Sequence, residues 1–186
     1  RKTNVSSFGV WESLKYDKIK EQVQLLYSKI DPNTFSKDRH VKEFAIDLCK
    51  YSNPYQVVIS VVEPKQTLGE TLVYINEKIE DFKKQNDPSN KSEFITYDIL
   101  LVPEMFWEIN HKYKEPVNVD LYQNISLRFD RNGTVLEDKS NPMKKYVDRR
   151  FEFDRPFMLY IKKRSSTQPF FVMWVDNAEL LNKKSL

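Results

Sequence analysis

The sequence predicts an α+β fold of mostly antiparallel β-sheets with two main helices. From residue 44 to residue 175, alternating or continuous apolar segments are separated by turn residues, which is the pattern of strands joined by hairpins. Two stretches, 17–30 and 68–84, carry apolar residues at steps of three and four, the spacing of a helix with one buried face. With 186 residues, 40% of them hydrophobic, the chain can close one core. We predict a single domain, 1–186, with a loosely ordered segment at 1–16.

The two predicted helices rest on different signals. The first, 17–30, has apolar spacing behind Asp17 as a candidate cap, and turn residues follow it at 31–33. The second, 68–84, also has a start signal, because Thr67 and Glu70 have the spacing of a capping box. Its apolar positions are Leu68, Leu72, Ile75, Ile79 and Phe82. The sequence therefore predicts an amphipathic helix at each place.

The first and last pairs of strands are predicted to form hairpins. Residues 44–49 and 55–62 flank the turn residues 52–54, and residues 157–163 and 170–175 flank a polar stretch. The last pair is almost continuously apolar. Such continuity predicts a sheet that is covered on both faces.

Longer strands are predicted between these hairpins. An apolar strand at 94–102 is interrupted by Pro103, and alternation then resumes at 107–113. Apolar residues at odd positions predict a strand with one buried face over 117–129. The dipeptide Asn132-Gly133 tolerates the backbone angles of a tight turn, so a return strand is predicted at 134–136.

Composition excludes several classes of function. Three glycines, far apart in the sequence, cannot form a glycine-rich phosphate loop, and a single cysteine excludes an internal disulfide. Two histidines do not make a zinc site by themselves, so we expect no metal and no cofactor. A net charge of +3 is too small to indicate nucleic-acid binding, and no apolar run is long enough to span a membrane.

Catalytic motifs are not found in the sequence. Cys49 lies in a predicted strand without a nucleophile motif, which favours a structural thiol. His111 shares a strand face with Trp107, Ile109 and Tyr113, which also favours a structural role. We therefore expect no catalytic residue. An enzyme that uses His111 with a nearby acid is a third and weaker hypothesis.

A local basic bias marks the charged loop 137–150 as a candidate binding surface. Its cations include Lys144, Lys145, Arg149 and Arg150. Clustered cations can contact an acidic partner, and a protein partner is the one we expect here. A solvated loop would show the same composition.

From about residue 44 onward, the order of elements resembles the C-terminal half of a serpin. Residues 151–161 (FEFDRPFMLYI) are similar to the strand of that family that begins with a basic residue, proline and phenylalanine, and 170–172 fall where its final strand starts. Residues 102–109 resemble the proline-containing strand that enters the large serpin sheet. Residues 127–134 (LRFDRNGT) are similar to the hinge before the reactive loop, and the resemblance implies a hinge-like turn at Asn132, Gly133 and Thr134.

The departures from this resemblance concern inhibition. An inhibitory serpin has small residues after this hinge, because that stretch must insert as a strand into a sheet. Here the residues are 135–140 (VLEDKS), whose bulk and charge oppose insertion. The resemblance therefore implies a non-inhibitory protein with a binding or structural role through 137–150. The alternative is a serine-protease inhibitor that offers Arg149 or Arg150 as bait.

Overall fold

The computed structural model describes residues 13–15, 23–30, 41–84, 94, 98–114, 120–129, 149–179 and 181. Within these residues the chain forms ten strands and one helix. The strands belong to three sheets, of five, three and two strands. The predicted α+β fold with mostly antiparallel sheets is confirmed, whereas the prediction of two main helices is wrong for the described residues.

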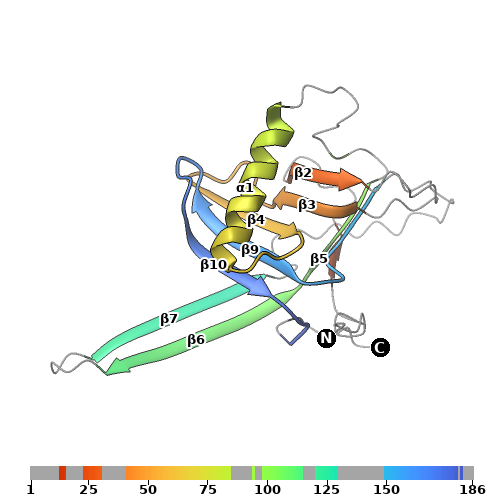
Figure 1. Cartoon of the computed structure of the whole chain (residues 1–186). Helices are drawn as coiled ribbons and strands as arrows, with labels where there is room; N and C mark the ends of the chain where they lie inside the picture. The colour runs from red at the N-terminus through yellow and green to blue at the C-terminus, as the bar shows by residue number, and fades with distance from the viewer. Residues whose placement is uncertain are drawn as a thin grey trace, which may run out of the picture.

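The five-stranded sheet is the centre of the fold and is antiparallel throughout (Figure 1). Its order is β10-β9-β4-β3-β2. These strands are β2 (Gln24–Ile30), β3 (Val41–Asp47), β4 (Tyr55–Val61), β9 (Phe157–Lys163) and β10 (Pro169–Val175). Both predicted hairpins, β3–β4 and β9–β10, are present, and they meet where β4 pairs with β9.

Apolar side chains are buried on both faces of this sheet, as the continuity of the last two strands predicts. On β9, Leu159 belongs to one hydrophobic cluster, whereas Met158 and Tyr160 belong to the other. The second cluster is completed by Ile75 and Ile79 of the helix α1 (Leu68–Lys84). Figure 1 shows α1 crossing that face of the sheet.

Helix α1 has the predicted bounds and the predicted start. The Glu70 amide donates to Thr67 Oγ1 at 3.1 Å, and the Thr67 amide donates to Glu70 Oε2 at 3.3 Å. Two amides that lack partners within the helix are thus satisfied by side chains. The capping box is therefore confirmed.

Replacing Thr67→Ala is expected to lower the free energy of unfolding by about 1 kcal/mol, because the Glu70 amide loses its acceptor. Urea denaturation followed by circular dichroism measures this change. Thr67→Ser keeps the hydroxyl and serves as the matched control. An equal loss in both variants would show that the hydroxyl does not stabilise the helix.

The segment 17–30, predicted as a helix, instead contributes the edge strand β2. Leu25 packs in one hydrophobic cluster, and its neighbours Leu26 and Tyr27 pack in the other. Adjacent residues on opposite buried faces are typical of a strand covered on both sides, and apolar steps of three and four can arise there by coincidence. Pairing with β3 therefore overrides the helical spacing; residues 17–22 lie outside the described residues.

The two smaller sheets hold the remaining strands. Strand β5 (Ile99–Pro103) lies between β1 (Ser13–Lys15), which is antiparallel to it, and β8 (Arg150–Glu152), which is parallel. β1 falls inside the segment 1–16 that was predicted to be loosely ordered, and its three residues are paired. β6 (Met105–Lys114) and β7 (Asp120–Phe129) form a long ribbon that extends from the rest of the fold (Figure 1).

A group of aromatic rings joins β8 to the central sheet. The Phe44 ring lies 5.3 Å from the Phe151 ring and 5.1 Å from the Phe153 ring, both edge to face. Phe153 in turn lies 5.2 Å from Phe157. All four side chains are fully buried. This cluster fixes β8, and with it the C-terminal end of the loop 137–150, against the core.

Candidate functional site

The structure places one predicted binding residue, Arg149, in the interior. Its Nη2 lies 2.6 Å from Asp98 Oδ2, and its Nε lies 3.1 Å from both carboxylate oxygens. Only 8% of the Arg149 side chain and 1% of the Asp98 side chain are exposed. The guanidinium carbon also lies 5.4 Å from the Phe151 ring centre. Arg149 is therefore an internal ion-pair partner and not an exposed loop cation.

The second predicted bait residue, Arg150, is the first residue of β8. Its Nη2 lies 2.5 Å from Glu152 Oε1, and about a third of the side chain is exposed. It pairs across the sheet with Ile99 of β5. Its backbone is thus part of the short edge strand β8, whereas the sequence analysis places it at the end of the charged loop 137–150.

The other predicted site residues lie outside the described residues. They are Lys144, Lys145, Asn132, Gly133 and Thr134, together with the return strand predicted at 134–136. The segment 130–148 joins the end of β7 to Arg149. The structure therefore describes both anchors of this segment: the β6–β7 ribbon at its start, and the Arg149–Asp98 pair with β8 at its end.

His111 lies in β6, opposite Gln123 of β7. The strand position predicted for it is confirmed. Among the described residues, no group of three His, Cys, Asp or Glu side chains is arranged to hold a metal ion. No helix in that same part of the chain has the length and apolar character needed to span a membrane.

Cys49 lies in the turn after β3, whereas the sequence predicts it inside a strand. β3 ends at Asp47, and the Cys49 amide donates to Asp47 Oδ1 at 2.9 Å. A side-chain acceptor two residues back is a turn interaction that competes with strand pairing. Burial raises the pKa of the Cys49 thiol, and the charge of Asp47 raises it further, while Arg164 acts in the opposite direction.

Alkylation of Cys49 by iodoacetamide is expected to reach its half-maximal rate at a higher pH in the folded protein than in the urea-unfolded chain. The reason is that the thiolate reacts, and folding raises the thiol pKa. Because the pKa of Cys49 is higher in the folded protein, the protonated thiol contributes fully to the free energy of unfolding at a pH below the unfolded thiol pKa. This contribution is lost as the pH rises through the folded pKa. Rates measured across pH test this. A midpoint at or below that of the unfolded chain would contradict it.

Asp47 is the centre of a polar network that links the β3–β4 and β9–β10 turns. Its fully buried carboxylate accepts from Gln56 Nε2 at 3.0 Å and from Arg164 Nη1 at 2.8 Å. Arg164 also donates through Nε to the carbonyl oxygen of Ser52 at 2.7 Å and through Nη2 to that of Cys49. A buried carboxylate needs such partners to offset its desolvation. The network holds the two turns together.

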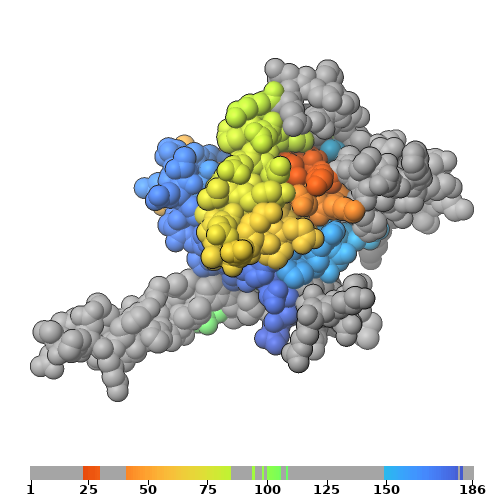
Figure 2. Space-filling view, in the orientation of Figure 1, coloured from red at the N-terminus to blue at the C-terminus, as the bar shows by residue number. Residues whose placement is uncertain are grey.

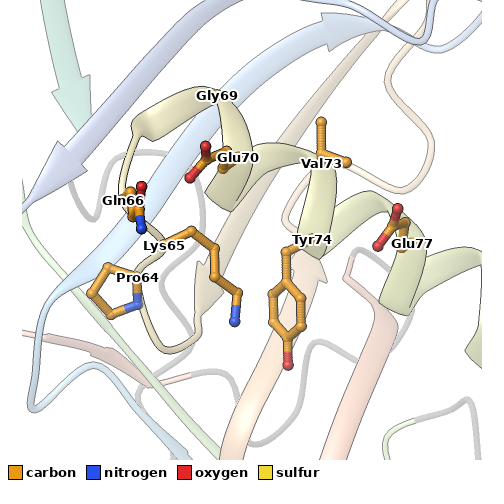
Figure 3. Close-up of a pocket in the computed structure, with 8 residues that line it drawn as sticks. All are labelled: Pro64, Lys65, Gln66, Gly69, Glu70, Val73, Tyr74 and Glu77. Carbon is orange, nitrogen blue, oxygen red and sulfur yellow. The ribbon is translucent and has the colours of Figure 1, made fainter.

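An open hollow over the first half of α1 is a second candidate site, which the sequence analysis did not identify (Figure 3). Tyr74 is one of its lining residues, and the Lys65 ammonium lies 3.9 Å from the Tyr74 ring centre. Its hydroxyl donates to Glu43 Oε2 at 3.1 Å, and the Tyr27 hydroxyl donates to the same oxygen at 3.1 Å. The lining residues are Pro64, Lys65, Gln66, Gly69, Glu70, Val73, Tyr74 and Glu77.

Three of the polar residues that line this hollow, Lys65, Glu70 and Tyr74, have interaction partners. Burial and the Glu43 charge raise the pKa of Tyr74 and of Tyr27, so both phenols stay protonated and act as donors at neutral pH. Glu70 serves the helix cap. Helical spacing predicts which side of α1 is polar, but the position of Glu43 beneath Tyr74 depends on sheet packing. No local sequence signal could have located it.

The chain matches no protein-family model and no curated protein sequence. Among solved structures it is similar to thyroxine-binding globulin in complex with thyroxine, with a TM-score of 0.42 and 16% identity over 89% of this chain and 44% of that chain. It is also similar to tengpin, a thermophilic serpin in the native state, with a TM-score of 0.39 and 16% identity over 90% of this chain and 52% of that chain. The chain thus spans about half the length of these structures. The second of these structures is a serpin, the family whose C-terminal half the sequence resembles.

Proposed function

We propose that this chain is a non-inhibitory, serpin-like protein that acts by binding a partner and carries out no catalysis. The observation that supports this most directly is the buried Arg149–Asp98 pair. A protease of trypsin-like specificity must take the bait side chain into its own pocket. Arg149 would first have to leave Asp98, so the buried ion pair between them would be lost during that exchange.

The residues next to Arg149 support the same proposal. Arg150 is engaged with Glu152 and belongs to β8, so the last part of the loop 137–150 is held in a sheet. A bait segment must adapt to the cleft of a protease. In addition, 135–140 (VLEDKS) carries the bulk and charge that oppose insertion into a sheet. Lys144 and Lys145 are the loop cations that we propose for contact with an acidic protein partner.

Incubation with trypsin tests the proposal. We expect full trypsin activity on a small chromogenic substrate after mixing with excess protein, and no complex that survives SDS. Slowed substrate cleavage or an SDS-stable complex would instead favour the inhibitor alternative. Arg149→Ala and Arg150→Ala would then identify the bait residue, because only replacement of the true bait would abolish the complex.

A further inference from the structure

Two turns at one end of the central sheet form a surface that is separate from the loop 137–150. Residues 50–55 include the turn that leads from β3 into the first residue of β4, and residues 162–170 run from the end of β9 through the next turn to the start of β10; we call these two ranges together the tip. The Arg164 amide donates to the Pro54 carbonyl oxygen at 2.8 Å, and the Tyr55 and Phe170 rings lie 5.6 Å apart. Figure 1 shows the two turns side by side, and Figure 2 shows this end as a protruding edge.

The tip exposes aromatic side chains. Tyr51 is 72% exposed, Phe170 is 64% exposed and Tyr55 is 45% exposed. The only other large apolar side chains that are exposed in the described part of the chain are Leu68 and Val73 of α1. Scattered exposed apolar residues are ordinary, but adjacent aromatic rings on a protrusion mark a contact surface. The Phe170 side chain carries no polar atom, so no hydrogen bond to water offsets its exposure.

The charge of the tip is positive. Its sequence, 50–55 (KYSNPY) and 162–170 (KKRSSTQPF), contains four basic residues and no acidic residue. The nearest buried acid, Asp47, is already paired with Arg164. Burial lowers the pKa of Lys162, and the charges of Lys83 and Arg164 lower it further, while Glu80 and Asp47 act in the opposite direction. An anionic partner complements this surface.

A flat partner fits the tip better than a peptide does. An extended peptide is recognised by an open strand edge or a groove, whereas a protruding edge meets a planar surface with all its exposed side chains at once. Aromatic rings favour the interface between lipid headgroups and acyl chains, and lysines pair with anionic headgroups. The Asp47–Arg164 network already holds the two turns in place, so little ordering is needed on binding.

We propose that the tip binds the surface of a bilayer that contains anionic lipid, with Phe170 entering the interface and Lys50 and Lys163 contacting headgroups. One apolar anchor alone gives only marginal membrane binding, and a second, electrostatic signal strengthens it. The tip supplies both. This proposal does not depend on the loop 137–150 or on the absence of protease inhibition.

Sedimentation of the full chain with vesicles tests it. We expect the protein to sediment with vesicles of phosphatidylcholine and phosphatidylserine, and not with phosphatidylcholine alone. Phe170→Ser, and separately the double variant Lys50→Glu/Lys163→Glu, should each weaken binding by about tenfold. The matched controls are Leu68→Ser, an exposed apolar position on α1, and Lys29→Glu on β2; both should bind as the parent does.

Circular dichroism confirms that each variant is folded before its binding is compared. Absence of sedimentation with the phosphatidylserine vesicles would overturn the proposal. So would sedimentation that the tip variants and the controls change equally. Retention of the chain on heparin or on polyglutamate, without vesicle binding, would also overturn it, because the tip would then recognise a soluble polyanion.

Discussion

Asp98→Asn is expected to lower the free energy of unfolding by about 3–5 kcal/mol. The variant removes the carboxylate charge that Asp98 places beside Arg149, whose side chain is only 8% exposed and whose Nε and Nη2 donate to Asp98. Removing one member of a buried ion pair costs far more than the pair itself contributes. Urea denaturation monitored by circular dichroism measures the loss.

A double-mutant cycle separates the charge effect from packing. Asp98→Asn combined with Arg149→Gln removes both charges, so the double variant should be more stable than the sum of the two single losses predicts. The exposed pair of Arg155 and Asp154, 3.1 Å apart with 40% and 48% of the side chains exposed, is the matched control. Arg155→Gln should change stability by less than about 1 kcal/mol. If Asp98→Asn were as mild as this control, Arg149 could leave its site easily, and the case for a non-inhibitory protein would be weakened.

Phe44→Ala is the second variant with a large expected effect, a loss of about 3–5 kcal/mol in the free energy of unfolding. Phe44 is fully buried, and its ring contacts both Phe151 and Phe153 edge to face. The alanine variant leaves a cavity between the central sheet and β8. Because β8 carries the C-terminal anchor of the loop 137–150, this loss should also make that loop easier to cleave.

Thermal or urea unfolding measures the stability change, and limited trypsin digestion measures the cleavage rate. Phe44→Leu keeps most of the volume and should lose less, which gives a folded intermediate case if the alanine variant does not fold. Phe170→Ala, at a position that is 64% exposed, is the control of the same residue type and should lose less than about 1 kcal/mol. Equal losses at positions 44 and 170 would show that the aromatic cluster does not stabilise β8.

Local signals made part of the fold predictable. Helix 68–84 was predicted at its observed bounds because Thr67, Glu70 and the apolar spacing are all contained within one helix length. The two hairpins were predicted because each strand pair is adjacent in sequence and separated by turn residues. In both cases, the interactions that define the element join residues close together in the chain.

The prediction at 17–30 was wrong because two periodicities overlap there. Apolar steps of three and four agree with a helix, but Leu25 and Leu26 are both buried, on opposite faces of the sheet. The choice between helix and strand depends on two other elements: β3, which pairs with this segment, and α1, which covers one of its faces. Neither is a property of the segment itself.

The candidate site shows the same division between local and distant interactions. The sequence alone determined the capped helix, the hairpins and the charged stretch 137–150, since these depend on neighbouring residues. Only the tertiary structure decided that Arg149 is buried, because its partner Asp98 lies 51 residues away and β5 brings the two together through its parallel pairing with β8. In an exposed loop, water solvates the charge of an arginine. In the core, the same charge needs a counter-charge beside it, and only the folded chain determines whether one is present.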